Sequence, residues 1–147
     1  ADHDHPSRLL SFESERMTAS QHAHDLLAVA VRAADAKGGE DFVALDVSEQ
    51  SPFTDVFLLV TGSSERNVVA ISEGIEDALL EAGSRTLRRE GRDGGRWVLI
   101  DFGDLVVHVF HGEERMYYGL ERLWLDCPAI PVADLVPHAP GTSAAGE

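Results

Sequence analysis

The hydrophobic positions of the chain follow two different spacings, one typical of helices and one typical of strands. An apolar stripe that includes Leu27, Val31 and Ala34 predicts a helix, which begins after Thr18 and Gln21 at capping-box spacing and ends at Gly38 and Gly39. A second helix is predicted between Ser63 or Ser64, either of which can cap it, and Gly83. Its stripe contains Val68, Ile71, Ile75, Ala78, Leu79 and Ala82. A third helix is predicted over residues 113–125, where Met116, Leu120 and Leu123 recur at helical spacing.

Five segments rich in strand-forming residues lie between these helices. They are Phe42–Val47, Val56–Thr61, Thr86–Arg89, Trp97–Asp101 and Leu105–Phe110. The predicted order is therefore αββαβββα. One mixed sheet of about five strands with helices packed on it is the simplest layered arrangement for this order, so we expect a single α/β (α+β) domain.

The two ends of the chain lack these patterns. Residues 1–16 show no sustained period and precede Met17, so we interpret them as a leader that is disordered or foreign to the natural chain. Residues 127–147 hold four of the six prolines and are expected to form a flexible acidic tail. The folded domain is thus predicted over residues 17–126. No run approaches the ~20 apolar residues that cross a bilayer, and we expect a cytoplasmic protein.

Charge narrows the range of partners. The chain has 26 acidic and 12 basic side chains, a formal net charge of −14, which repels nucleic acid as a whole and favours a basic partner. The local charge is positive around Arg85, Arg88 and Arg89, although the chain as a whole is negative. These arginines could make a minor contact with rRNA or lie on a solvated hairpin.

Catalytic motifs are largely missing from the sequence. It contains no GxGxxG, GxxxxGK[ST], HExxH or GxSxG string, and its single Cys127 rules out an internal disulfide and a cysteine-based metal cage. We therefore expect no catalytic residues, no metal and no cofactor. The alternative is a small nucleotidyltransferase-like or metal-dependent enzyme that uses Asp101, Asp104 and His108.

Strand alternation and helical spacing indicate a surface for binding a protein. Trp97, Leu99 and Asp101 share one strand face, and an aromatic ring beside a carboxylate suits a Lys or Arg side chain of a basic partner. In the next predicted strand, Leu105, Val107 and Val109 take one face, and Val106, His108 and Phe110 take the other. Polar residues flank the predicted strand Val56–Thr61 and are expected to form a polar rim around one strand end: Thr54 and Asp55 precede the strand, and Thr61, Gly62, Ser63, Ser64 and Arg66 follow it. The last predicted helix adds Tyr118, Glu121 and Trp124 as interface candidates or core supports.

Two strings together carry a family resemblance. The segments ALDVSEQSPFTDVFLLVTGSSERNV and WVLIDFGDLVVHVFHGEERMYYGLERLW, with D-x-G-D-x-V-V-H-V and R-x-x-Y-x-L-E-x-L-W in order, resemble the ribosomal silencing factor family, the Iojap-like proteins, over roughly residues 22–126. The resemblance implies a nucleotidyltransferase-like topology without catalytic residues. It also implies binding to large-subunit ribosomal protein fourteen on the free large subunit, a steric block to the small subunit, and repression of translation when nutrients are short.

Position by position, the resemblance and the strand faces give one candidate binding surface. Its expected members are Trp97, Asp101, Asp104, His108, Tyr118, Glu121 and Trp124, with Thr61, Ser63 and Arg66 as weaker members. A homodimer that uses the same aromatic surface stays open as an alternative.

Overall fold

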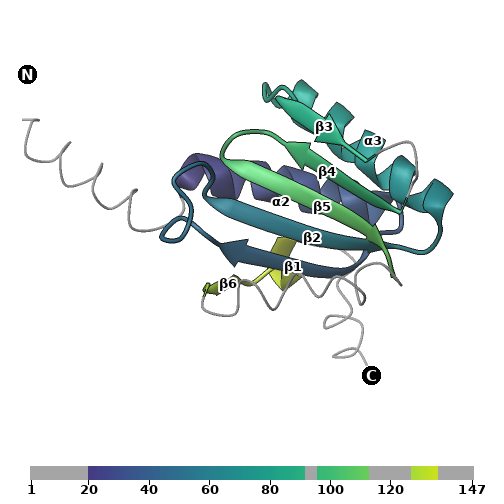
Figure 1. Cartoon of the computed structure of the whole chain (residues 1–147), viewed down its shortest axis with the longest axis horizontal. Coiled ribbons are helices and arrows are strands. Elements are labelled where there is room, and N and C mark those ends of the chain that lie inside the picture. Colours follow the sequence, from purple (N-terminus) through teal and green to yellow (C-terminus); the bar gives the residue numbers. More distant parts are fainter. Residues whose placement is uncertain (1–19, 92–95, 113–126, 136–147) are drawn as a thin grey trace, which may run out of the picture.

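The computed structural model describes residues 20–91, 96–112 and 127–135. They form one mixed sheet with two α-helices on one of its faces (Figure 1). The elements in chain order are α2 (Gln21–Ala36), β1 (Glu40–Asp46), β2 (Val56–Gly62), α3 (Glu65–Glu81), β3 (Arg88–Glu90), β4 (Trp97–Asp101), β5 (Leu105–His111), β6 (Ala129–Ile130) and the 3₁₀ turn η3 (Ala133–Leu135). No described helix meets the length and hydrophobicity that crossing a membrane demands.

The strand order across the sheet is β3-β4-β5-β2-β1-β6. The central pair, β2 and β5, is parallel, and every other pair is antiparallel. The parallel pair needs a crossover, and α3 with the β3-β4 hairpin supplies it between β2 and β5. The α/β fold with a single mixed sheet is thus confirmed, with six strands where the sequence predicted about five.

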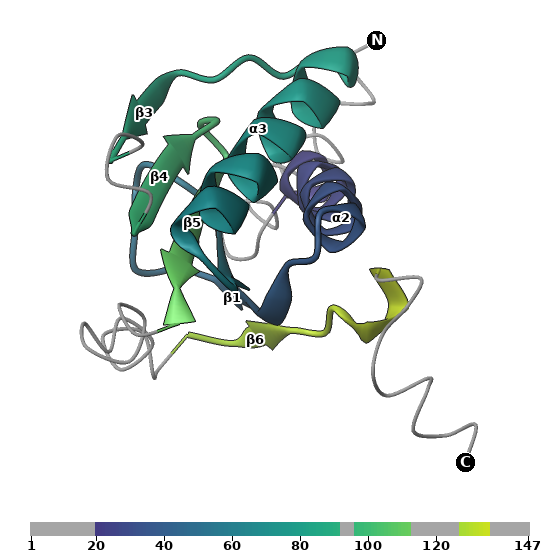
Figure 2. The ribbon, with the colours of Figure 1, turned by 90° about the vertical axis from the view of Figure 1, so that its right-hand side faces the viewer.

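The helices lie together on one side of the sheet, as the view from the side shows (Figure 2). Strand residues that point toward them are fully buried, among them Leu58 of β2, Val107 of β5 and Ile100 of β4. On the helices, Leu27 and Val31 of α2 and the α3 residues Val68, Ile71, Ile75 and Leu79 meet this strand face in one core. The helical and strand periods of the sequence therefore both point into the same layer.

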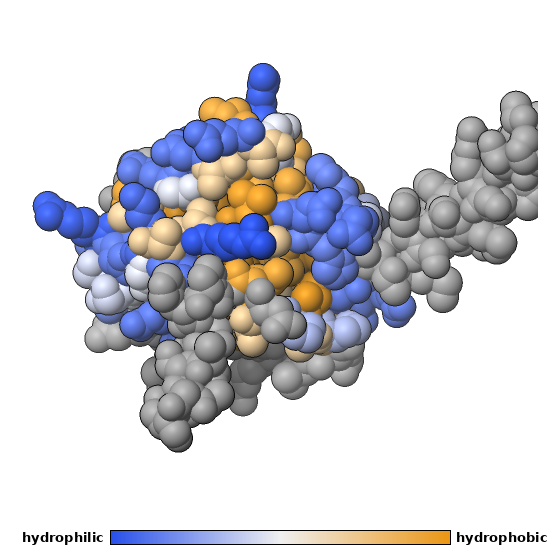
Figure 3. Space-filling view, turned by 180° about the vertical axis from the view of Figure 1, so that it is seen from behind, coloured by the Kyte–Doolittle hydropathy of each residue, from blue (hydrophilic) through white to orange (hydrophobic). Residues whose placement is uncertain are grey.

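Partly buried apolar residues fringe this core on the helix side. They are Val29, Ala33, Phe42, Ile130, Val132 and Leu135. Viewed from behind, hydrophobic side chains gather at the centre of this side and hydrophilic ones surround them (Figure 3).

The capping serines differ in part from the sequence expectation. The N-cap of α2 is Ser20, whose side-chain oxygen accepts from the Ala23 N–H at 3.1 Å, whereas Thr18 lies outside the described residues. The N-cap of α3 is Ser64, whose oxygen accepts from the Asn67 N–H at 3.0 Å. Each cap satisfies one backbone donor at the start of its helix.

Residues 127–135 pack on the domain, in contrast to the flexible tail expected from residue 127 onward. Strand β6 pairs with β1, where Ala44 lies opposite Ile130. Cys127 is buried, and Val132 and Leu135 pack against the core. Two strand residues with four prolines nearby give too weak a local signal, and only the pairing with β1 makes them a strand. The third predicted helix, residues 113–125, lies outside the described residues.

Candidate functional site

The sheet face opposite α2 and α3, which we call the pocket face, is turned toward the viewer in Figure 1. The strand registers arrange its side chains in three rows across β4, β5 and β2. The rows are Trp97, Phe110 and Thr61; then Leu99, His108 and Leu59; then Asp101, Val106 and Phe57. Because strand side chains alternate between faces, the sequence predicted correctly which residues of β4 and of β5 share a face.

A pocket of about 610 Å³ lies over the second and third rows and reaches Trp97 of the first row. Its described lining residues are Ser51, Phe53, Thr54, Phe57, Leu59, Arg88, Trp97, Leu99, Asp101, Val106 and His108. One end is aromatic, and the other end holds the polar side chains of Thr54, Arg88 and Asp101. A concave, mostly apolar site with a few polar groups is the usual form of a ligand or anchor site.

Four aromatic rings pack together on the pocket face, and three of them, those of Trp97, His108 and Phe57, line the pocket. The Trp97 ring stacks on Phe110 with 5.5 Å between ring centroids, and the His108 ring stacks on Phe110 at 5.9 Å. Phe57 meets His108 edge-on at 5.3 Å. The Trp97 Nε1–H donates to His108 Nδ1 at 3.3 Å. These contacts hold Trp97, which stays partly exposed, in one orientation on the pocket face.

His108 is uncharged at neutral pH. Its side chain is 7% exposed, and this burial lowers the pKa of His108 from 6.5 to about 4. Because Nδ1 accepts from Trp97, the single proton of the neutral ring lies on Nε2. A general acid or base works best with a pKa near the working pH, so His108 is poorly matched to acid–base catalysis.

The burial of His108 predicts a pH-dependent stability. The unfolded chain takes up a proton on this histidine below about pH 6.5 and the folded chain does so only below about pH 4, so stability falls as the pH drops through this window. Urea unfolding should show a loss of about 2 kcal/mol from this group between about pH 7.5 and about pH 5.

The matched variant is His108→Gln, which keeps an acceptor for Trp97 but does not titrate. Between about pH 7.5 and about pH 5, the free energy of unfolding of this variant should fall by about 2 kcal/mol less than that of the parent. Equal pH dependence in the parent and the variant would contradict a buried, neutral His108.

The two aspartates of the candidate set play different parts. Asp101 lines the pocket, and its Oδ1 accepts from the Gly103 N–H at 2.8 Å in the β4-β5 turn. Asp104 does not line it. Its backbone carbonyl accepts from the N–H groups of Asp55 and Val56, both at 3.1 Å, which joins the start of β5 to the start of β2. Within residues 20–91, 96–112 and 127–135, no three His, Cys, Asp or Glu side chains are grouped as metal ligands. The enzyme alternative thus gains no support.

The weaker candidates lie at the other end of the sheet. Thr61 lies opposite Phe110 in the first row and is buried. Ser63 and Arg66 are exposed around the start of α3, where the Ser63 N–H donates to the Asn67 side chain at 2.9 Å. The structure therefore separates this rim from Asp101. Tyr118, Glu121 and Trp124 lie outside the described residues.

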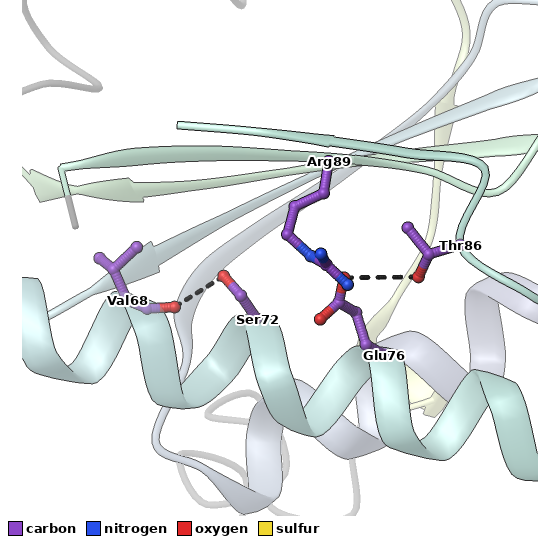
Figure 4. A network of polar contacts seen from close by, with 5 residues as sticks. All are labelled: Val68, Ser72, Glu76, Thr86 and Arg89. Carbon is purple, nitrogen blue, oxygen red and sulfur yellow. Dashed lines mark hydrogen bonds and ion pairs between the residues drawn. The ribbon is translucent and has the colours of Figure 1, made fainter. Parts of the chain in front are cut away.

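The basic cluster on β3 is largely paired with carboxylates. Arg89 binds Glu76 of α3, which also accepts from Thr86, so this network ties β3 to α3 (Figure 4). Arg88 lies 3.4 Å from Glu90, measured from Nε to Oε2. This leaves less positive charge for rRNA than the sequence suggests.

The sequence did not identify the loop that closes the polar end of the pocket. Ser51, Phe53 and Thr54 belong to a turn-type stretch that separates β1 from β2, and the sequence assigned Thr54 only to a polar rim. An available signal was Phe53, a large hydrophobic residue within a turn, which is 86% exposed in the structure.

Comparison with known proteins agrees with the resemblance. A model of the family described as "Ribosomal silencing factor during starvation" matches residues 20–146. The chain belongs to the ribosomal silencing factor family. The match extends beyond the 22–126 range of the resemblance and includes β6 and η3, so the C-terminal segment lies within the family's pattern.

Individual relatives support the family assignment. A ribosomal silencing factor of Bacillus subtilis is 47% identical over 110 residues, which are 75% of this chain and 91% of that protein. A crystal structure from Bacillus halodurans is 45% identical with a TM-score of 0.66, and the match covers 74% of this chain and 98% of that one. A mouse protein named "Mitochondrial assembly of ribosomal large subunit protein 1" is 29% identical over 91 residues, 60% of this chain and 40% of its own length.

Proposed function

We propose that this chain binds large-subunit ribosomal protein fourteen on the free large ribosomal subunit and keeps the small subunit from docking. Membership of the ribosomal silencing factor family is the observation that carries the proposal. The mouse relative, which is named for assembly of the large subunit, favours the large subunit over the small one.

The chemistry of the pocket face supports a basic protein as the direct partner. Trp97 is partly exposed and lines the pocket two rows from the Asp101 carboxylate, and the chain as a whole carries a net charge of −14. One Lys or Arg side chain of the partner would contact the ring and another would contact the carboxylate, while the long-range field would attract the basic partner. Arg85, Arg88 and Arg89 are proposed to add a minor contact with rRNA.

Inhibition by this route is steric and needs no covalent step. A bound domain would occupy the surface at which the small subunit joins, and translation would fall when the factor is abundant relative to free large subunits. The family description names starvation, which supports nutrient limitation as the condition that we propose.

Sedimentation with separated ribosomal subunits tests the proposal. The purified chain should co-sediment with large subunits and not with small subunits at moderate salt, because the recognised protein is on the large one. Added before small subunits, it should reduce the yield of joined ribosomes, and it should have less effect on ribosomes already joined.

Two controls make the result decisive. Isolated ribosomal protein fourteen should bind the chain directly, and an unrelated basic ribosomal protein should not. The mass of the free chain in solution shows whether the pocket face is instead occupied by a second copy. Equal recovery with both subunits, or no effect on joining, would contradict the proposal.

A further inference from the structure

The loop between β1 and β2 presents a large hydrophobic side chain to solvent. Phe53 is 86% exposed, and it belongs to the lining of the pocket, so it stands at the pocket rim. Single exposed apolar side chains are common on protein surfaces, so exposure alone does not indicate a binding site. Phe53 differs from such residues in the rigidity of its loop, in the apolar surface beside it and in the charge around it.

Hydrogen bonds hold this loop in one conformation. The Val47 N–H donates to the Asp55 carbonyl at 2.9 Å, which closes the base of the loop. The Val47 carbonyl accepts from the N–H groups of Gln50 and Ser51, at 3.0 and 2.8 Å. The Ser51 hydroxyl oxygen accepts from the Phe53 N–H at 3.2 Å. Because the loop is already ordered in the free chain, a partner that covers Phe53 loses little affinity to ordering it.

The loop is fixed beside the apolar part of the pocket. Its Asp55 N–H donates to the Asp104 carbonyl at 3.1 Å, so the loop lies at the same end of the sheet as the β4-β5 turn (Figure 1). Apolar side chains that line the same pocket include Phe57, Leu99 and Val106. The ring of Phe53 therefore extends an apolar surface and is not an isolated exposed side chain.

The charges around Phe53 are mainly negative. Four acidic residues belong to this loop and to the residues around the β4-β5 turn, namely Glu49, Asp55, Asp101 and Asp104. Arg88, the base among the described lining residues, is paired with Glu90 at 3.4 Å, measured from Nε to Oε2. An apolar ring among carboxylates suits a protein surface on which basic side chains border an apolar recess.

We propose that Phe53 is an anchor of the interface with the basic ribosomal protein, and that its ring enters an apolar recess on that protein. The inference rests on the proposed function and adds the β1-β2 loop to the surface that includes Trp97 and Asp101. A small molecule enclosed in the pocket would leave most of this ring in water, because the ring stands mostly outside the pocket. A protein surface that lies across the pocket can bury the ring, and a buried aromatic ring is a common source of binding energy.

Phe53→Ala should weaken binding to free large subunits, and to isolated large-subunit ribosomal protein fourteen, by about tenfold or more. Its melting temperature should stay within about 2 °C of the parent, because so exposed a side chain adds little to the stability of the folded state. The matched control is Leu80→Ala, which removes a 62% exposed side chain from α3, in the layer behind the sheet. Leu80→Ala should bind within about twofold of the parent.

Phe53→Asp distinguishes an apolar anchor from a purely electrostatic surface. The added carboxylate increases the long-range attraction of a basic partner, so binding would strengthen if charge alone decided it. An anchor that enters an apolar recess predicts the opposite, a loss at least as large as that of Phe53→Ala, because the recess would have to bury an ionised carboxylate. Phe53→Leu keeps an apolar side chain and should lose less binding than Phe53→Ala.

Parent-like binding by Phe53→Ala, or stronger binding by Phe53→Asp, would overturn the anchor, while co-sedimentation of the parent with large subunits would leave the proposed function standing. Absence of binding by the parent would contradict the proposed function, and this inference would fall with it. The mass of each variant in solution tests the remaining occupant, a second copy of the chain. If the parent were a dimer, Phe53→Ala a monomer, and their binding to large subunits equal, the ring would join two copies and the proposal would be wrong.

Discussion

Replacing Asp101 by Arg should weaken binding to free large subunits by about 30-fold or more, which corresponds to about 2 kcal/mol. Asp101 lies in the third row of the pocket face, between Arg88 and Val106. If basic side chains of the partner meet this carboxylate, charge reversal replaces attraction by repulsion at a contact that is partly removed from water. Sedimentation binding curves at two salt concentrations measure the loss, which should be larger at low salt.

Two matched variants distinguish a local contact from a change in net charge or in fold. Asp101→Asn keeps an acceptor for the Gly103 N–H, so it should fold like the parent and show a smaller loss of binding. Asp77→Arg makes the same charge change at an exposed position of α3, in the layer behind the sheet. It should bind nearly as well as the parent. Parent-like binding by Asp101→Arg, or an equal loss in Asp77→Arg, would place the interface elsewhere.

Leu58→Ala should destabilise the domain by about 3 kcal/mol, a large part of the stability of a domain of this size. Leu58 is fully buried on the helix-side face of β2, opposite Val107 in the central parallel pair. Truncation leaves a cavity where β2, β5 and the helices meet, and the closely packed layer does not collapse to fill it. Urea unfolding at neutral pH measures the change.

Leu99→Ala provides the same chemical change on the other face of the sheet. Leu99 is partly exposed where it lines the pocket, so its truncation widens a space that is already open. The substitution should lower the free energy of unfolding by about 1 kcal/mol, which is the transfer free energy of the buried apolar area that it removes. If the two variants were equally destabilised, the pocket face would be packed as tightly as the helix-side core.

The positions of most elements follow from sequence pattern because the pattern has a direct geometric cause. Alternation along Trp97–Asp101 and Leu105–His111 placed the same side chains on the same faces that the structure shows. Capping serines and Gly83 marked the limits of α3 for a similar reason, since a helix end requires particular backbone partners. The nucleotidyltransferase-like topology and the contact residues at Tyr118, Glu121 and Trp124 stay predictions.

Pattern alone did not show which strands are neighbours. Residues 129–130 have no periodic signal and become a strand because β1 offers an edge for them to pair with. Likewise, sequence reasoning treated Thr61, Ser63 and Arg66 as part of the same surface as Asp101. The registers place Thr61 on the pocket face but two rows away from Asp101, and Ser63 and Arg66 follow the end of β2 on that far side.

The sequence by itself determined the α/β class, the faces of the central strands, the negative charge and the family of this protein. Each of these depends on neighbours along the chain or on composition, which folding does not change. Only the tertiary structure decided that Thr54, Arg88 and Asp101 meet at one end of a pocket and that burial keeps His108 uncharged. Those properties depend on contacts between residues far apart in sequence, because strand pairing and the removal of water arise only when the chain has folded.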